Sequence, residues 1–378
     1  METLQLDKPE LIVELKFNLK AERKPRIVYL DILRVLSIIS VITIHTVAGK
    51  VADINALGEP SWWWANVLNC MTRWAVPVFF MISGVLTLDS PQLDNIPRFI
   101  KSRFLKIGIP FFIWSVIYTL VMEIYILGKG ISFPEILGII CTNILFDRSY
   151  YHLWFVYDIF IIYLISPLLK KIVINSTKKE LEYWLGLWFI ATILYSSIQQ
   201  LLMFIGLNGY TYIHILNIPF VFGLTGYYIL GYYLHHYNLP KKLRMVIYIG
   251  AAISVFFAIF GTYTLSVSKN ILNESLYSHF ALTTAIISMA IFIAIKNINW
   301  EKFLAESFQK LLGTLSDATF GIYLIHMMLI INFSGRLSFL LSKSYALYTI
   351  SIIIISFVLS FIFVKLIQLI PYVGKNIV

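Results

Sequence analysis

Long apolar runs separated by short polar segments fill the chain and predict membrane-spanning helices. A helix rises 1.5 Å per residue, so about 20 apolar residues cross the hydrocarbon core of a bilayer. The sequence predicts ten such spans, at residues 29–50, 63–88, 107–127, 152–170, 182–205, 213–235, 244–267, 277–296, 312–332 and 345–370. The apolar run at 132–147 is shorter and is flanked by Pro134 and Asp147, which favours an interfacial or re-entrant segment.

Three ionisable residues, Asp31, Arg34 and His45, lie inside the first predicted span, in addition to Lys50 at its end. Such groups are costly in lipid unless they are paired or hydrated, so they indicate a functional site. Arg34 and His45 are eleven residues apart, which places both on one helix face and separates them by about 16 Å along the axis. Asp31 lies three residues before Arg34 and is expected to pair with it. The alternative is that Asp31 and Arg34 reach the headgroups while His45 caps the far end.

Composition supports a helical membrane protein, because 59% of the residues are hydrophobic and only 13% are charged, whereas soluble domains carry about 25% charged residues. The fold class predicted is therefore all-α, polytopic and integral to the membrane. The two cysteines, Cys70 and Cys141, both lie in apolar surroundings and form neither a disulfide framework nor a zinc motif.

The positive charge follows the topology. Of the 30 Lys and Arg residues, 22 lie in the segments 1–26, 89–106, 170–181, 236–244, 296–311 and the C-terminal part. These segments are on one side of the membrane if ten spans alternate, so the positive-inside rule predicts that both termini are cytoplasmic. This explains the net charge of +10 without nucleic acid as a partner. The predicted organisation is a cytoplasmic tail at 1–26 with an apolar face suited to the membrane surface, a membrane domain at 27–370 and a cytoplasmic tail at 371–378.

This orientation places three histidines, His45, His152 and His326, in the outer half of the membrane. A shared metal is one reading, but the spacing has no H-x-x-x-H pattern and no carboxylate cluster. No metal is therefore predicted, and a proton-handling cavity is favoured.

Four stretches resemble one known family. They are the first span with Arg34 and His45, RWAVPVFFMISG at 73–84, RFLKIGIPFF at 103–112, and HLWFVYDIFIIYLISPLL at 152–169 taken together with FGIYLIH at 320–326. The chain resembles the acyltransferase-3 family of bacterial membrane proteins, which includes O-acetyltransferases of lipopolysaccharide and other cell-surface glycans. Lys106 stands where the family usually has Arg, which keeps the charge but loses the bidentate fork. Asp317 has no counterpart to which a role could be assigned.

The resemblance implies an enzyme that transfers an acyl group, usually acetyl, from acyl-coenzyme A to a hydroxyl of a carbohydrate. Acetyl-CoA is the expected donor, and a cell-envelope or exported glycan, or a lipid-linked saccharide, is the expected acceptor. The expected location is the bacterial inner membrane, in contact with lipid. A transporter or flippase for a lipid-linked saccharide is the rival from another class, but the chain lacks the internal repeat that transporters commonly show.

Roles for individual residues follow from this resemblance. His45 is the expected general base, which either deprotonates the acceptor hydroxyl directly or first assists acyl transfer from the donor. Arg34 is the group expected to hold the thioester or its oxyanion, with Asp31 orienting Arg34. Five cations are expected to bind the polyanionic donor: Arg73, Arg98, Lys101, Arg103 and Lys106. The four of these in the 89–106 and 103–112 stretches also fit plain positive-inside charge. His152, His326 and Trp154 are expected on the acceptor side. For His326, a histidine that is hydrogen-bonded between helices is an equal alternative, and for Trp154 an interfacial aromatic belt is the favoured explanation.

Overall fold

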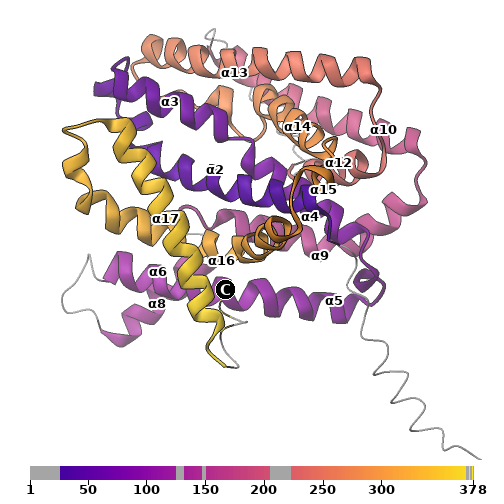
Figure 1. The fold of residues 1–378 in the computed structure, drawn as a ribbon, viewed down its shortest axis with the longest axis horizontal. Coiled ribbons are helices and arrows are strands. Elements are labelled where there is room, and N and C mark those ends of the chain that lie inside the picture. The colour runs from indigo at the N-terminus through magenta and orange to yellow at the C-terminus, as the bar shows by residue number, and fades with distance from the viewer. Residues whose placement is uncertain are drawn as a thin grey trace, which may run out of the picture.

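The computed structural model describes residues 26–124, 132–146, 150–204 and 223–371, together with 374 and 377. In these ranges every regular element is helical (Figure 1). The α-helices are α2 (Val28–Ala52), α3 (Pro60–Thr72), α4 (Ala75–Leu88), α5 (Ile96–Arg103), α6 (Ile109–Tyr118), α8 (Phe133–Leu145), α9 (Trp154–Asn175), α10 (Lys178–Trp188), α11 (Tyr195–Phe204), α12 (Thr225–His236), α13 (Lys241–Lys269), α14 (Leu282–Lys296), α15 (Trp300–Phe303), α16 (Glu306–Arg336) and α17 (Tyr345–Gln368). Short turns η1 (Ile54–Ala56), η2 (Pro91–Asp94), η7 (Ser275–Tyr277) and η8 (Ser338–Leu340) are 3₁₀, whereas η3 (Phe104–Gly108), η4 (Thr119–Ile124) and η5 (Phe189–Leu194) are π-helical.

Eight helical segments of the described chain are long and apolar enough to cross a membrane, which confirms the predicted all-α, multi-pass architecture. They are Val28–Ala52, Pro60–Leu88, Ile96–Val121, Lys178–Leu202, Lys241–Lys269, Ser275–Lys296, Glu306–Arg336 and Tyr345–Gln368. The predicted span at 152–170 appears as α9, a helix of 22 residues that also carries Asp158, Lys170 and Lys171. The span at 213–235 is described only from residue 223 onward, and the tail at 1–26 lies outside the described residues apart from Arg26. The number of ten and the cytoplasmic position of both termini stay predictions.

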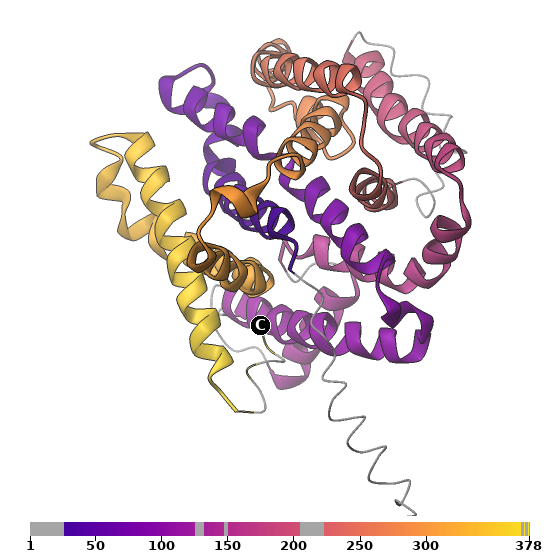
Figure 2. The same ribbon diagram turned by 45° about the vertical axis from the view of Figure 1, so that its right-hand side comes forward.

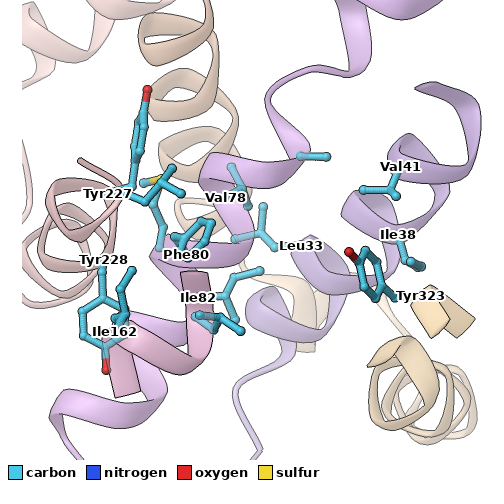
Figure 3. Close-up of a cluster of buried hydrophobic side chains, with 14 of the residues drawn as sticks. Leu33, Ile38, Val41, Val78, Phe80, Ile82, Ile162, Tyr227, Tyr228 and Tyr323 are labelled. Carbon is cyan, nitrogen blue, oxygen red and sulfur yellow. The ribbon is translucent and has the colours of Figure 1, made fainter. Parts of the chain in front are cut away.

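Helix α2 occupies the middle of the bundle. Helices α3, α4, α14, α16 and α17 all pack against it, as the two ribbon views show (Figures 1 and 2). Leu33, Ile38 and Ile42 of α2 are fully buried, and Figure 3 shows Leu33 and Ile38 within the same core as Phe80 of α4. Because α2 is covered on so many sides, its polar residues must face either protein partners or an internal cavity.

The predicted span at 63–88 is broken into α3 and α4 at Arg73 and Trp74. Pro77 explains the position of the break. A proline inside a helix has no N–H to donate, and its ring clashes with the carbonyl four residues earlier, which here belongs to Arg73. The interruption therefore leaves Arg73 at the point where the helix changes direction inside the bundle.

The segment 89–106, predicted as a basic loop, is largely helical. Helix α5 begins at Ile96, with Asn95 as its N-cap and Pro97 in its first turn, and it continues through η3 into α6. The cap and the proline are both helix-start signals, and a count of basic residues does not take them into account. Its four basic residues consequently stand on the first turns of a candidate span, Ile96–Val121, instead of on a loop.

Helices α4 and α12 approach each other closely through two glycines. A methyl group on Gly84 would overlap the backbone oxygen of Tyr228, and one on Gly231 would overlap that of Met81. In both cases the obstacle is backbone, which cannot turn away as a side chain can.

We expect Gly84→Ala to destabilise the protein strongly, because overpacking costs about 1–3 kcal/mol even where side chains can adjust. The measurement is the melting temperature of the purified protein in detergent, together with its size-exclusion profile. Gly49→Ala in α2 is the matched control, because nothing lies within 4 Å of its added methyl group. If Gly84→Ala melted at the temperature of the control, the close approach of α4 and α12 would be wrong.

Candidate functional site

Three histidines from distant parts of the chain lie together near one end of α2. His45 extends from α2, His152 precedes α9, and His326 lies on α16. The ring centre of His326 is 5.3 Å from that of His45 and 5.2 Å from that of His152, while His45 and His152 are 6.1 Å apart. The sequence-based prediction that these imidazoles share one level of the bundle is confirmed.

The hydrogen bonds of this cluster leave several ring nitrogens available. His326 donates from Nδ1 to the carbonyl oxygen of Tyr323 at 2.6 Å, so its Nε2 is an acceptor that has no partner among the described residues. Both ring nitrogens of His152 are buried and likewise without a partner in the described chain. Buried polar groups are nearly always hydrogen-bonded, so these exceptions indicate a site for a polar ligand or water.

His45 lines a cavity of about 250 Å³ beside this cluster. The cavity is mostly aromatic, with a few polar groups directed into it, which is the usual character of a small-molecule site. Its lining residues are Val41, Ile44, His45, Ala48, Arg73, Val76, Phe79, Tyr151, His152, Trp154, Phe155, Glu274, His279 and Tyr323. We call it the histidine cavity.

Arg73 supplies the positive charge of the histidine cavity. Its Nε donates to Oδ1 of Asn69 at 3.0 Å, and its guanidinium lies 4.3 Å from the ring centre of Tyr277. A terminal nitrogen is 3.9 Å from a carboxylate oxygen of Glu274. Arg73 was predicted as a donor-binding residue. It lines the histidine cavity together with His45, where polar groups can solvate an arginine that lies within a span.

Sequence reasoning missed Tyr151, His279 and Glu274. The ring of Tyr151 lies 5.3 Å from that of His45, and the ring of His279 lies 4.8 Å from that of Trp154 at a tilt of 35°. Trp154 was expected on the acceptor side, and it does line the histidine cavity. The available signal for Tyr151 was its position next to His152, whereas the position of His279 depends on how α14 packs and has no local signature.

A second cavity, of about 400 Å³, lies nearer the start of α2, and we call it the arginine cavity. Its lining residues are Arg34, Phe79, Ile82, Ser83, Lys106, Ile107, Phe155, Ile159, Tyr163, Ser316, Asp317, Thr319, Phe320 and Tyr323. Nη1 of Arg34 donates to the hydroxyl of Ser316 at 3.4 Å, and no salt bridge within the described chain involves Arg34. Arg34 and Lys106 therefore bring two cations into one cavity.

The remaining basic residues of α5 lie differently. Arg103 packs its guanidinium over the rings of Phe99 and Tyr163, each at 4.9 Å, and Tyr163 is itself part of the arginine cavity. Arg98 and Lys101 are exposed on α5 and are not among the residues that line this cavity. The π-helical turn η3 starts between Arg103 and Lys106, so the regular α-helical spacing ends between these two residues.

Asp31 pairs with Arg26 and not, as expected, with Arg34. Nε of Arg26 lies 2.6 Å from a carboxylate oxygen of Asp31, and Nη2 lies 2.7 Å from one of Asp317. Nη2 also donates to the carbonyl oxygen of Gly313 at 2.6 Å. Arg26 thus joins the beginning of α2 to α16, which gives Asp317 a structural role and leaves Arg34 to the cavity. Arg26 and Asp317 are 291 positions apart in the sequence, so local spacing does not reveal their interaction.

The described residues include one close group of side chains of the types that bind metals, and it lies outside the histidine cavity. The one group of three such residues with ligand atoms within 4.8 Å of each other, among the residues that the structure describes, is Asp89, His235 and His236. His235 is hydrogen-bonded to the hydroxyl of Tyr29 at 2.6 Å, which places the group at the opposite end of α2 from His45.

Comparison with known proteins was informative at the level of the family. No match was found among curated proteins or among solved structures. A family model, described as an acyltransferase domain, matches residues 27–365, a range that contains every residue lining the two cavities. The chain therefore belongs to the acyltransferase-3 family of membrane acyltransferases.

Proposed function

We propose that this protein is an O-acyltransferase of the bacterial inner membrane that takes an acyl group, in the first instance acetyl, from cytoplasmic acyl-CoA. The acceptor is a hydroxyl of a cell-envelope or exported glycan. The observation that carries the proposal is the pair of cavities along α2, one containing Arg34 and Lys106 and the other containing His45 with two further imidazoles.

The arginine cavity suits the donor. Coenzyme A carries several phosphate charges, and Arg34 and Lys106 face a common space where they can bind anionic oxygens. Arg103 is held next to this space over Tyr163, while the exposed Arg98 and Lys101 add positive potential outside it. If the termini are cytoplasmic as predicted, this is the side on which acyl-CoA is available.

The histidine cavity suits the chemistry. His45 removes the proton from the acceptor hydroxyl, whose oxygen attacks the thioester carbonyl carbon. Arg73 lies in the same cavity and is positioned to stabilise the oxyanion that forms on the carbonyl oxygen. The carbon–sulfur bond then breaks as the ester bond is completed, and His45 returns its proton to the sulfur, so that the coenzyme leaves as the free thiol.

His152, His326 and Trp154 are proposed to contact the acceptor. Nε2 of His326 and the two ring nitrogens of His152 are buried groups without partners in the described chain, and a sugar hydroxyl can both donate and accept. Trp154 offers an aromatic face for a sugar ring, and the tilted ring of His279 lies beside it.

The direct test is reconstitution of the purified protein in vesicles with labelled acetyl-CoA and a candidate glycan. The proposal expects release of free coenzyme and label in the glycan. If saccharide crosses the vesicle membrane while no coenzyme is released and no acceptor is labelled, the enzyme function is wrong and a transport function takes its place.

The donor site is tested by Arg103→Ala combined with Lys106→Ala. Hydrogen bonds to charged groups contribute about 1.5–3 kcal/mol each, so we expect the apparent KM for acyl-CoA to rise by about 10-fold or more. The value of kcat should change much less, because neither residue lines the histidine cavity. Lys242→Ala, an exposed cation in the first turn of α13 that has no role in the proposed donor site, is the control. An unchanged KM in the double variant would assign these charges to membrane topology alone.

A further inference from the structure

The two cavities are separated by three aromatic side chains. Among the described residues, Phe79, Phe155 and Tyr323 are the ones that line both the histidine cavity and the arginine cavity. They come from α4, α9 and α16, respectively. The ring centres of Phe79 and Phe155 are 5.9 Å apart, and those of Phe155 and Tyr323 are 5.5 Å apart. At these distances the rings are in contact, so they close the space between the cavities.

Phe79, Phe155 and Tyr323 together form a partition between the two cavities. One of these side chains is held in place, and the other two can move more easily. Tyr323 is only 6% exposed, and its hydroxyl donates to the backbone carbonyl of His152, which holds the ring in place. Figure 3 shows Tyr323 extending from α16 toward Ile38 and Val41 of α2. Phe79 and Phe155 are only partly buried and have no polar group that anchors them, so they can turn aside more easily.

The distance between the two sites makes the partition relevant to transfer. Arg34 and His45 are separated by about 16 Å along α2. A donor whose phosphates are held at Arg34 and Lys106 reaches His45 only if its narrow thioester end passes between these rings. The histidine cavity beyond them, at about 250 Å³, is smaller than the roughly 300–1,000 Å³ of a typical ligand pocket, and it must hold the acyl group beside the acceptor.

From this geometry, and resting on the proposed acyltransferase function, we infer that Phe79 and Phe155, closing against Tyr323, determine acyl-chain length. They form a boundary of the small histidine cavity, which leaves room there for an acetyl group beside the acceptor but not for a longer acyl chain. They also keep the two cavities from forming a continuous aqueous path across the bundle.

The selectivity test compares acetyl-CoA with butyryl-CoA for the wild type, Phe79→Ala and Phe155→Ala. We expect the ratio of kcat/KM for butyryl-CoA over acetyl-CoA to rise at least 10-fold in the alanine variants, since one methylene in an apolar site accounts for about 10- to 200-fold discrimination. Phe79→Leu and Phe155→Leu, which retain more volume, should show a smaller rise and keep the test usable if an alanine variant fails to fold. Phe256→Ala, an exposed residue of α13, is the control. An unchanged ratio in all four partition variants would overturn the proposed selectivity.

A second measurement does not depend on catalysis. In a background with Cys70→Ser and Cys141→Ser, a Ser83→Cys variant places a thiol in the arginine cavity and an Ala48→Cys variant places one in the histidine cavity. A charged, membrane-impermeant thiol reagent should modify the first from the face that carries Arg26 and the second from the opposite face. Adding Phe155→Ala should let the reagent reach Ser83→Cys from both faces.

The two measurements separate the possible failures. If Ser83→Cys reacts equally from both faces in the otherwise unchanged protein, the partition does not exist and the inference is wrong. If the thiols react as expected while no acyl-CoA of any length supports transfer, the partition stands as a barrier and it is the proposed acyltransferase activity that fails.

Discussion

Replacing His45 with alanine is expected to lower the rate of acyl transfer by about 10²- to 10⁴-fold, the usual contribution of a general base. A sugar hydroxyl is a weak nucleophile near neutral pH, and His45 is the imidazole of the cluster that extends from the central helix into the histidine cavity. The loss should appear in kcat, measured as release of free coenzyme at saturating acetyl-CoA. The apparent KM for the donor should change little, because His45 does not line the arginine cavity.

A matched control distinguishes this effect from the general loss of a histidine. His236 lies at the opposite end of α2, where its Nε2 is 2.9 Å from Asp89, and His236→Ala should retain turnover. Gly49→Ala, one turn beyond His45 with open space around it, tests whether α2 tolerates substitution there. If His45→Ala matched these controls in turnover while remaining folded by size exclusion, His45 would have no part in the reaction.

The sequence was sufficient to identify the central helix and its three polar residues. Lipid accepts long apolar helices and penalises ionisable groups, so hydropathy locates the spans and the exceptions within them locate the site. The alternation of charge then predicted that His45, His152 and His326 would lie at one level, and their ring centres are within 6.1 Å of each other. These predictions rest on one-dimensional properties of the chain, which is why they could be made without a structure.

Two details failed, and only the first of them depends on contacts between distant segments. Asp31 was expected to pair with Arg34 because they are neighbours on one helix face, but Arg26 approaches Asp31 from outside the helix and bridges to α16. Residues 89–106 were assigned to a loop because they lie between the predicted spans 63–88 and 107–127, although Asn95 and Pro97 are local signals that start a helix there.

The partition also depends on contacts between distant segments. The three rings of Phe79, Phe155 and Tyr323 meet only in the folded bundle, and nothing in their local sequence distinguishes them from other aromatic residues of the spans.

Arg34→Ala is expected to impair the enzyme without destabilising it. Asp31 is taken up by Arg26, so the guanidinium of Arg34 has only a 3.4 Å hydrogen bond to Ser316 as a partner within the described chain. A cation held in a bundle core without a carboxylate partner lowers the stability of the fold. Because Arg34 has no such partner in the described chain, it is available to bind an anionic ligand. We expect kcat/KM for acyl-CoA to fall by about 10- to 100-fold, since a charge-assisted hydrogen bond contributes about 1.5–3 kcal/mol. Arg34→Lys should recover part of the loss, because it keeps the charge but not the fork.

The melting temperature separates this role from a structural one, and Arg26 provides the comparison. Arg26→Ala removes the partner of Asp31, a carboxylate that is only 5% exposed, and so leaves a buried charge uncompensated. We expect Arg26→Ala to lower the melting temperature, whereas Arg34→Ala should leave it unchanged or raise it, because an unpaired buried charge has been removed. If Arg34→Ala instead melted at a lower temperature in parallel with its loss of activity, Arg34 would be a structural residue and the arginine cavity would need another cation for the donor.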